Sequence, residues 1–151
     1  MDMDSDAVAK AENTLREFWA EMYTWETEAL PQSDKVGTDA VEPVARALQV
    51  ICERFLVPKD RKYGRLFFVD GKPRCTNIGF PPEYNPQLET ILGHEVQDKK
   101  TIVINTELAN HLNKTLKTPQ RYQLVLSGDV FRVSKKERFS AAKNKWVLLH
   151  L

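Results

Sequence analysis

The apolar residues of this chain change their spacing once, from a helical to an extended period, and this change most constrains the fold. Between Asp6 and Leu30 they recur every three or four residues, which predicts one long amphipathic helix with a bulky buried stripe. The stripe comprises Val8, Ala11, Leu15, Phe18, Trp19, Met22 and Ala29. Trp25 lies beside it. This spacing favours a place in the core for Trp19 and Trp25; the second interpretation is that they are exposed anchors of an interface.

A second helix is expected from Pro43, because proline suits the first helical position and disfavours helical geometry at Glu42. Its apolar face is formed by Val44, Ala47, Leu48, Ile51, Cys52 and Phe55. Pro58 marks its end. Residues 32–38 are expected to form a turn between the two helices.

The extended period begins at Arg65. Residues 65–69 predict a short strand, Asp70 and Gly71 a tight hairpin turn, and residues 73–78 the return strand. Further strands are expected over residues 88–95, 101–107, 122–126, 130–133 and onward, and 145–149. Residues 109–120 are polar and are interpreted as a long connection.

Two helices followed by a run of mostly antiparallel strands predict an α+β fold, with the N-terminal helices packed on one face of a curved sheet. Composition does not change along the chain, so residues 1–151 are expected to form a single domain. Residues 1–5 are expected to be a flexible tail.

Net charge and the absence of targeting signals limit the kinds of partner expected for this protein. Lysine and arginine total 22 against 21 acidic residues, and this net charge of +1 disfavours nucleic acid as the partner. The acidic N-terminus lacks the features of a signal peptide, and no apolar run approaches the roughly 20 residues of a membrane span. We therefore expect a cytoplasmic protein without a membrane partner. Cys52 and Cys75 are expected to be free thiols in a reducing compartment.

No catalytic constellation is evident in the sequence. His94, His111 and His150 are far apart, and neither a metal-ligand pair nor a nucleophile motif nor a phosphate-binding glycine pattern occurs. A buried Glu83 or Glu89 could serve as a general base, but a solvated carboxylate is the plainer interpretation. We expect no catalytic residue, no metal and no cofactor, and a protein that is not an enzyme and works by binding.

Five residues are predicted to bind the partner. Three prolines stiffen residues 81–86, so an exposed Tyr84 beside Glu83 would lose little entropy on binding; alternatively, Tyr84 caps the core. Lys135 and Lys136 begin a basic stretch, residues 135–138, which is either a patch for an acidic partner or a solvated turn between the last strands. Arg74 on the expected hairpin completes the set.

Several segments together carry a resemblance to a known family. They are residues 18–26 of the first helix, the loop Gly79–Pro86 leading into residues 89–91, the strand pair 101–106 and 122–126, and residues 130–133 followed by Lys145 and Trp146. In this order they resemble the bacterial immunity proteins that have the fold of nuclear transport factor 2, from about residue 13 to the end. The most specific piece is Pro-Pro-Glu-Tyr in the loop. Phe131 stands where many members carry tryptophan, and the connection 109–120 looks like an elaboration.

The resemblance implies a cone-shaped sheet closed on one side by helices. It also implies a role in polymorphic toxin systems of interbacterial competition, in which the protein binds a cognate toxin domain and neutralises it by stoichiometric occlusion. The free protein would be a monomer or a weak homodimer. An alternative is a small-molecule enzyme or ligand-binding protein using the pocket between sheet and helices, although the inward-facing candidates are mainly apolar. A third reading is a dimerisation or scaffold module.

Overall fold

The computed structural model describes residues 3–36, 38–58, 65–76, 78–149 and 151. Two long helices, α1 (Ser5–Ala29) and α2 (Glu42–Phe55), come first and are joined by the short 3₁₀ helices η1 (Leu30–Lys35) and η2 (Asp39–Val41). The strands that follow are β1 (Leu66–Val69), β2 (Lys72–Cys75), β3 (Glu89–Val96), β4 (Thr101–Ala109), β5 (Lys117–Ser127), β6 (Val130–Ser140) and β7 (Lys145–Leu149). The α+β order predicted from the sequence is confirmed.

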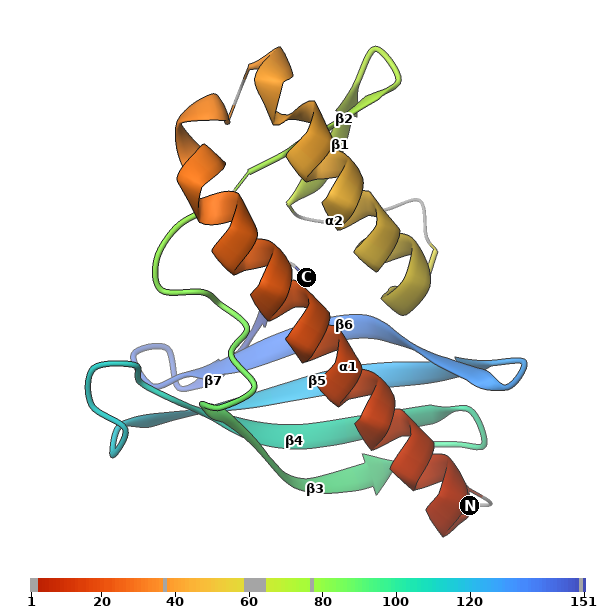
Figure 1. Cartoon of the computed structure of the whole chain (residues 1–151). Coiled ribbons are helices and arrows are strands. Elements are labelled where there is room, and N and C mark those ends of the chain that lie inside the picture. The colour runs from red at the N-terminus through yellow and green to blue at the C-terminus, as the bar shows by residue number, and fades with distance from the viewer. Residues whose placement is uncertain (1–2, 37, 59–64, 77, 150) are drawn as a thin grey trace.

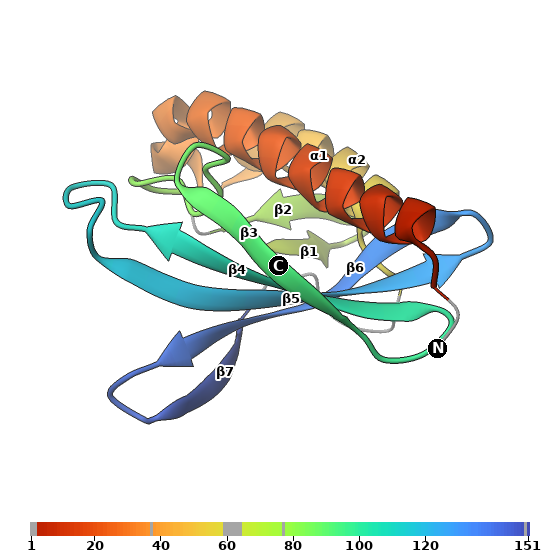
Figure 2. The same cartoon turned by 90° about the horizontal axis from the view of Figure 1, so that it is seen from below.

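The strands form two sheets. β3 to β7 pair in chain order as an antiparallel meander, and β1 and β2 form a separate hairpin that packs against α2. Both helices lie on the same side of the meander, and β7 turns away from them (Figures 1 and 2). Because the meander is antiparallel, the β4–β5 turn, the β6–β7 turn and the start of β3 lie at one end of the sheet.

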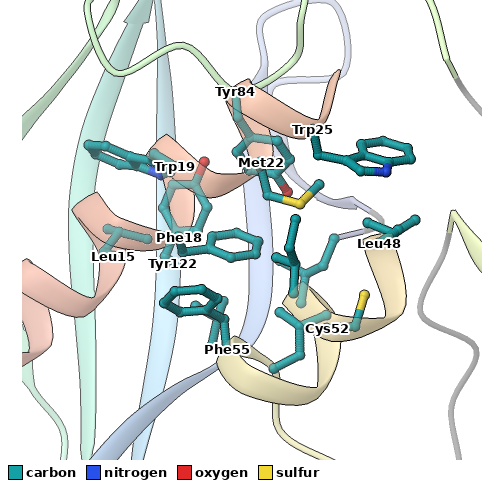
Figure 3. Packing of buried hydrophobic residues seen from close by; sticks show 14 of the residues in the cluster. Leu15, Phe18, Trp19, Met22, Trp25, Leu48, Cys52, Phe55, Tyr84 and Tyr122 are labelled. Atoms are coloured by element: carbon teal, nitrogen blue, oxygen red, sulfur yellow. The ribbon is translucent and has the colours of Figure 1, made fainter. Parts of the chain in front are cut away.

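The core lies between α1, α2 and the meander. α1 buries the stripe predicted for it, including Phe18, Trp19 and Met22, and α2 adds Leu48 and Phe55 (Figure 3). The indole Nε1 of Trp25 donates a hydrogen bond to the carbonyl oxygen of Val44 at 3.0 Å and so ties the two helices together. Trp19 and Trp25 are both buried, so they are core residues and not exposed anchors in this structure.

The structure corrects the expected connection over residues 109–120. β4 extends to Ala109 and β5 begins at Lys117, so the turn is short. In β5, exposed or partly exposed residues alternate with buried ones, of which Gln120 is the first, as is usual in a strand with one buried face. Asn110 and Asn113 accept hydrogen bonds from backbone N–H groups within the turn, which explains its polar composition.

The basic stretch 135–138 is also placed differently from its prediction. β6 continues to Ser140, so these residues form a strand and not a solvated turn. Smaller differences concern the return strand, which ends at Cys75, and the expected turn over residues 32–38, whose first part belongs to the 3₁₀ helix η1.

Residues 3 to 5, the described part of the expected tail, lead directly into α1. The side chain of Asp4 caps α1 by accepting a hydrogen bond from the backbone N–H of Ala7 at 2.8 Å, and α1 begins at Ser5. Met3 packs partly buried against the core. Residues 1 and 2, the rest of the predicted tail, lie outside the described residues.

Cys52 and Cys75 are both buried and neither forms a disulfide. Burial raises the pKa of the Cys75 thiol to about 11, which leaves it uncharged at neutral pH. In the described part of the chain, no helix is long and apolar enough to cross a membrane.

The packing of α2 makes a prediction about stability. Leu48 is buried in the core, whereas Val50, two residues further on, is 67% exposed. Leu48→Ala should lower the free energy of unfolding by about 3 kcal/mol, because it removes buried methyl groups and leaves a cavity. Val50→Ala should change it by less than about 0.5 kcal/mol. Urea denaturation followed by circular dichroism measures both, and equal losses would contradict the packing described.

Candidate functional site

The proline-rich loop, residues 79–86, is fastened to α1 by one buried carboxylate. Glu26 Oε2 accepts a hydrogen bond from the backbone N–H of Glu83 at 2.7 Å, and its Oε1 accepts one from that of Tyr84 at 2.9 Å. The guanidinium of Arg65 lies 3.2 Å from the same Glu26 carboxylate and also pairs with the side chain of Glu83. Charge-assisted bonds are stronger than neutral ones, so the loop is held firmly at residues 83 and 84.

Lys136 enters this cluster from β6. Its Nζ is 3.2 Å from Glu83 Oε1 and 4.1 Å from the centre of the Tyr84 ring, and the side chain is completely buried. Burial lowers the pKa of Lys136, and the carboxylates of Glu83 and Glu89 partly offset this effect. Burial alone would raise the pKa of Glu83, but the charges of Lys136 and Arg65 outweigh it and hold that pKa below its usual value.

A second buried carboxylate joins three strands. Glu89 on β3 accepts hydrogen bonds from Thr106 Oγ1 on β4 at 2.7 Å, and from Gln120 Nε2 and the Tyr122 hydroxyl on β5 at 2.7 and 3.3 Å. Gln120 in turn accepts a hydrogen bond from Arg138 Nε at 2.9 Å. The expectation that inward-facing residues are mainly apolar is therefore wrong for this end of the interior. These polar groups are hydrogen-bonded to one another and link the neighbouring strands.

Aromatic rings fill the space beside these polar groups. The ring of Phe18 meets that of Tyr84 edge-on with centroids 5.2 Å apart, and Trp19 meets Tyr122 in the same way at 5.8 Å. Figure 3 shows these side chains converging from α1, the loop and β5. The interior between helices and sheet is thus packed with side chains here.

The five residues predicted to bind a partner fall in different places. Glu83, Tyr84 and Lys136 are brought together, with Tyr84 and Lys136 fully buried and Glu83 half-buried. Tyr84 therefore caps the core, which is the second of the two alternatives. Arg74 is buried against the helical layer, where it pairs with Asp39. Lys135 precedes Lys136 in the strand, points to the opposite face and has a 44% exposed side chain.

Sequence reasoning missed several members of the cluster. Glu26 did carry a signal, because it lies four residues after Met22 and seven after Trp19, so it is a charged residue on a buried helical stripe. Arg65, at the start of the hairpin, carried no such signal. Glu89 was considered as a general base, but its role as an acceptor for side chains of β4 and β5 depends on the register of β3, β4 and β5.

A surface groove of about 560 Å³ lies between the proline-rich loop and the β4–β5 turn. Its lining includes Pro81, Pro82, Leu108, His111, Leu116 and Arg138. At its edge, the exposed ring of Phe80 packs edge-on against His111 with centroids 5.5 Å apart. A smaller hollow of about 400 Å³ lies around Trp25, where α1 ends and α2 begins. Among the described residues, no group of three or more His, Cys, Asp or Glu is arranged to hold a metal ion.

Comparison with known proteins identifies the class. Residues 10–149 match the family described as NTF2 fold immunity protein, and the chain belongs to this family. It is similar to Immunity protein RhsIA of Dickeya dadantii (strain 3937), with 33% identity over 145 residues. The match covers 95% of this chain and 98% of that protein. No solved structure matches significantly. The resemblance inferred from the loop and helix motifs is confirmed.

The two buried tyrosines should respond differently to loss of their hydroxyl groups. The Tyr84 hydroxyl has no hydrogen-bond partner among the described residues, whereas that of Tyr122 donates to the Glu89 carboxylate. Tyr84→Phe should leave the free energy of unfolding unchanged or raise it, because an unsatisfied buried group is removed. Tyr122→Phe should lower it by about 2 kcal/mol, as expected for a bond to a charged group. Denaturation by urea tests the pair; the reverse order would contradict these contacts.

The ion pair of Glu83 should be visible in the pH dependence of stability. A folded-state pKa below the unfolded value of about 4.3 contributes stability above that pH, and this contribution is lost as the pH falls through the folded value. Lys136→Met removes the principal cation and raises the folded pKa of Glu83. The loss of unfolding free energy between about pH 6 and pH 3 should therefore be smaller in this variant than in the wild type.

The neighbouring substitution Lys135→Met is the matched control, because Lys135 is exposed and lies on the other face of β6. It should retain the pH dependence of the wild type. Urea denaturation at a series of pH values, with NMR titration of the Glu83 carboxyl, measures both variants. A wild-type pH profile in Lys136→Met would show that Lys136 does not set the pKa of Glu83.

Proposed function

We propose that this protein neutralises a cognate toxin domain by forming a one-to-one complex that blocks the toxin's active site or its target-binding surface. The family match over residues 10–149 carries this proposal, and the similarity to an immunity protein along almost its whole length supports it. The protein acts in the cytoplasm of the producing cell and needs no cofactor.

A role in binding, without catalysis, agrees with how the interior is built. The buried carboxylates of Glu26 and Glu89 are both engaged by protein donors, and aromatic rings fill the adjacent space. A small-molecule enzyme would need polar groups that converge on an open pocket. The proline-rich loop is instead held in one conformation by α1, Arg65 and Lys136, and a prearranged loop loses little entropy when it binds another protein.

We assign different roles to the five residues predicted from the sequence. Lys135, on the exposed face of β6, contacts the toxin directly. Glu83, Tyr84 and Lys136 hold the proline-rich loop in the conformation that the toxin recognises. Arg74 fixes the β1–β2 hairpin to η2 through Asp39.

Co-expression tests the proposal. The toxin domain encoded beside this gene is induced in bacteria with and without this protein, and the two are then co-purified with an inactive toxin variant. We expect growth to be rescued and light scattering to give the mass of a one-to-one complex. An unrelated immunity protein expressed at the same level should not rescue growth. Absence of both rescue and complex, with this protein folded and abundant, would refute the proposal.

A further inference from the structure

The groove between the proline-rich loop and the β4–β5 turn is bordered by apolar side chains that the core does not use. Phe80 is 72% exposed, Leu116 is 60% exposed and Leu112 is 85% exposed. Phe80 lies in the loop, and Leu112 and Leu116 lie in the turn opposite. Scattered single apolar residues need no explanation, but Leu116 lines this hollow and Phe80 packs on His111, which lines it too.

Both sides of the groove are held in place. The loop is anchored through Glu83 and Tyr84 to the Glu26 carboxylate. The turn is closed by the side chain of Asn110, which accepts hydrogen bonds from two backbone N–H groups, and by that of Asn113, which accepts two from Thr115. A groove with prearranged walls binds a partner with a smaller entropic cost.

Cations surround this end of the sheet. They are Lys114 and Lys117 at the turn, Arg138 in the groove wall, and Lys143 and Lys145 at the β6–β7 turn. Two carboxylates of the region are already paired. Glu83 pairs with Arg65 and Lys136 and lies 3.9 Å from Arg138, and Glu107 lies 3.3 Å from Lys117. The rim therefore presents an excess of positive charge, although the net charge of the whole chain is only +1.

We propose that this groove receives an acidic segment of the cognate toxin domain. An apolar side chain of that segment packs against Leu116 and Phe80. Its flanking aspartate or glutamate side chains pair with Lys114 and compete with Glu107 for Lys117. This rests on the proposed function and adds the place and chemistry of the contact. An apolar centre with a charged rim is the usual arrangement of a protein interface, in which the centre provides most of the affinity and the rim provides rate and specificity.

The apolar contact is tested by Phe80→Ala and Leu116→Ala, with Leu148→Ala as the matched control. All three side chains are largely exposed, but Leu148 lies on β7 and does not line the groove. Each groove variant should raise the Kd for the inactive toxin domain by about tenfold or more, as truncation of an interface anchor does, and the control should stay within about twofold. Calorimetry measures binding, and circular dichroism verifies that each variant is folded.

The charged rim is tested by the double variant Lys114→Glu/Lys117→Glu, with Lys72→Glu on the β1–β2 hairpin as control. The double variant should weaken binding strongly at about 50 mM salt and much less at about 500 mM, because salt screens exposed charges. The control should show the wild-type salt dependence.

The outcomes separate this inference from the proposed function. If wild-type protein neither binds the toxin nor rescues growth, the proposed function fails. If the wild type binds and rescues, and the folded groove variants bind equally well, the toxin contacts another surface and this inference is overturned. A homodimer of the free protein that Phe80→Ala dissociates would also overturn it, because a second copy would then occupy the groove.

Discussion

The carboxylate of Glu26 is the contact on which the arrangement of this protein depends. It lies on the buried face of α1, accepts two backbone hydrogen bonds from the proline-rich loop and pairs with Arg65 beside the β1–β2 hairpin. Three segments far apart in the sequence thus meet at one side chain. A buried carboxylate without these donors would be strongly unfavourable, so the helix, the loop and the hairpin start must take up their positions together.

The polar interior extends this constraint into the sheet. Glu83 links Arg65 to Lys136 on β6, and Glu89 links β3 to β4 and β5. Burying such charges costs free energy that hydrophobic packing would not. The bonded network in turn favours one strand register and one loop conformation over the alternatives. A rigid surface of defined shape raises the specificity of binding, because partners that fit it less well leave clashes or unpaired polar groups.

Much of the architecture was predictable because it depends on local patterns. The 3.6-residue period of α1, the proline at the start of α2, and the Asp70–Gly71 turn all act over a few residues, and the structure confirms each. Strand ends were less predictable, since the polar residues of β5 and β6 look like loops until their pairing is known. The order of several short motifs, with that of the proline-rich loop the most specific, indicated the family, whereas the groove beside that loop was not foreseen.

The order of helices and strands, the buried face of α1 and the resemblance to the family could be predicted from the amino-acid sequence alone. Each depends on periodicity or on short motifs, which involve only residues close together in the chain. Tertiary structure decided which side chains are available to a partner. Tyr84 and Lys136, which as isolated residues suit a binding surface, are buried, and Phe80 is exposed beside His111. Exposure depends on contacts between residues distant in the chain, such as Lys136 with Glu83, and no local pattern encodes those contacts.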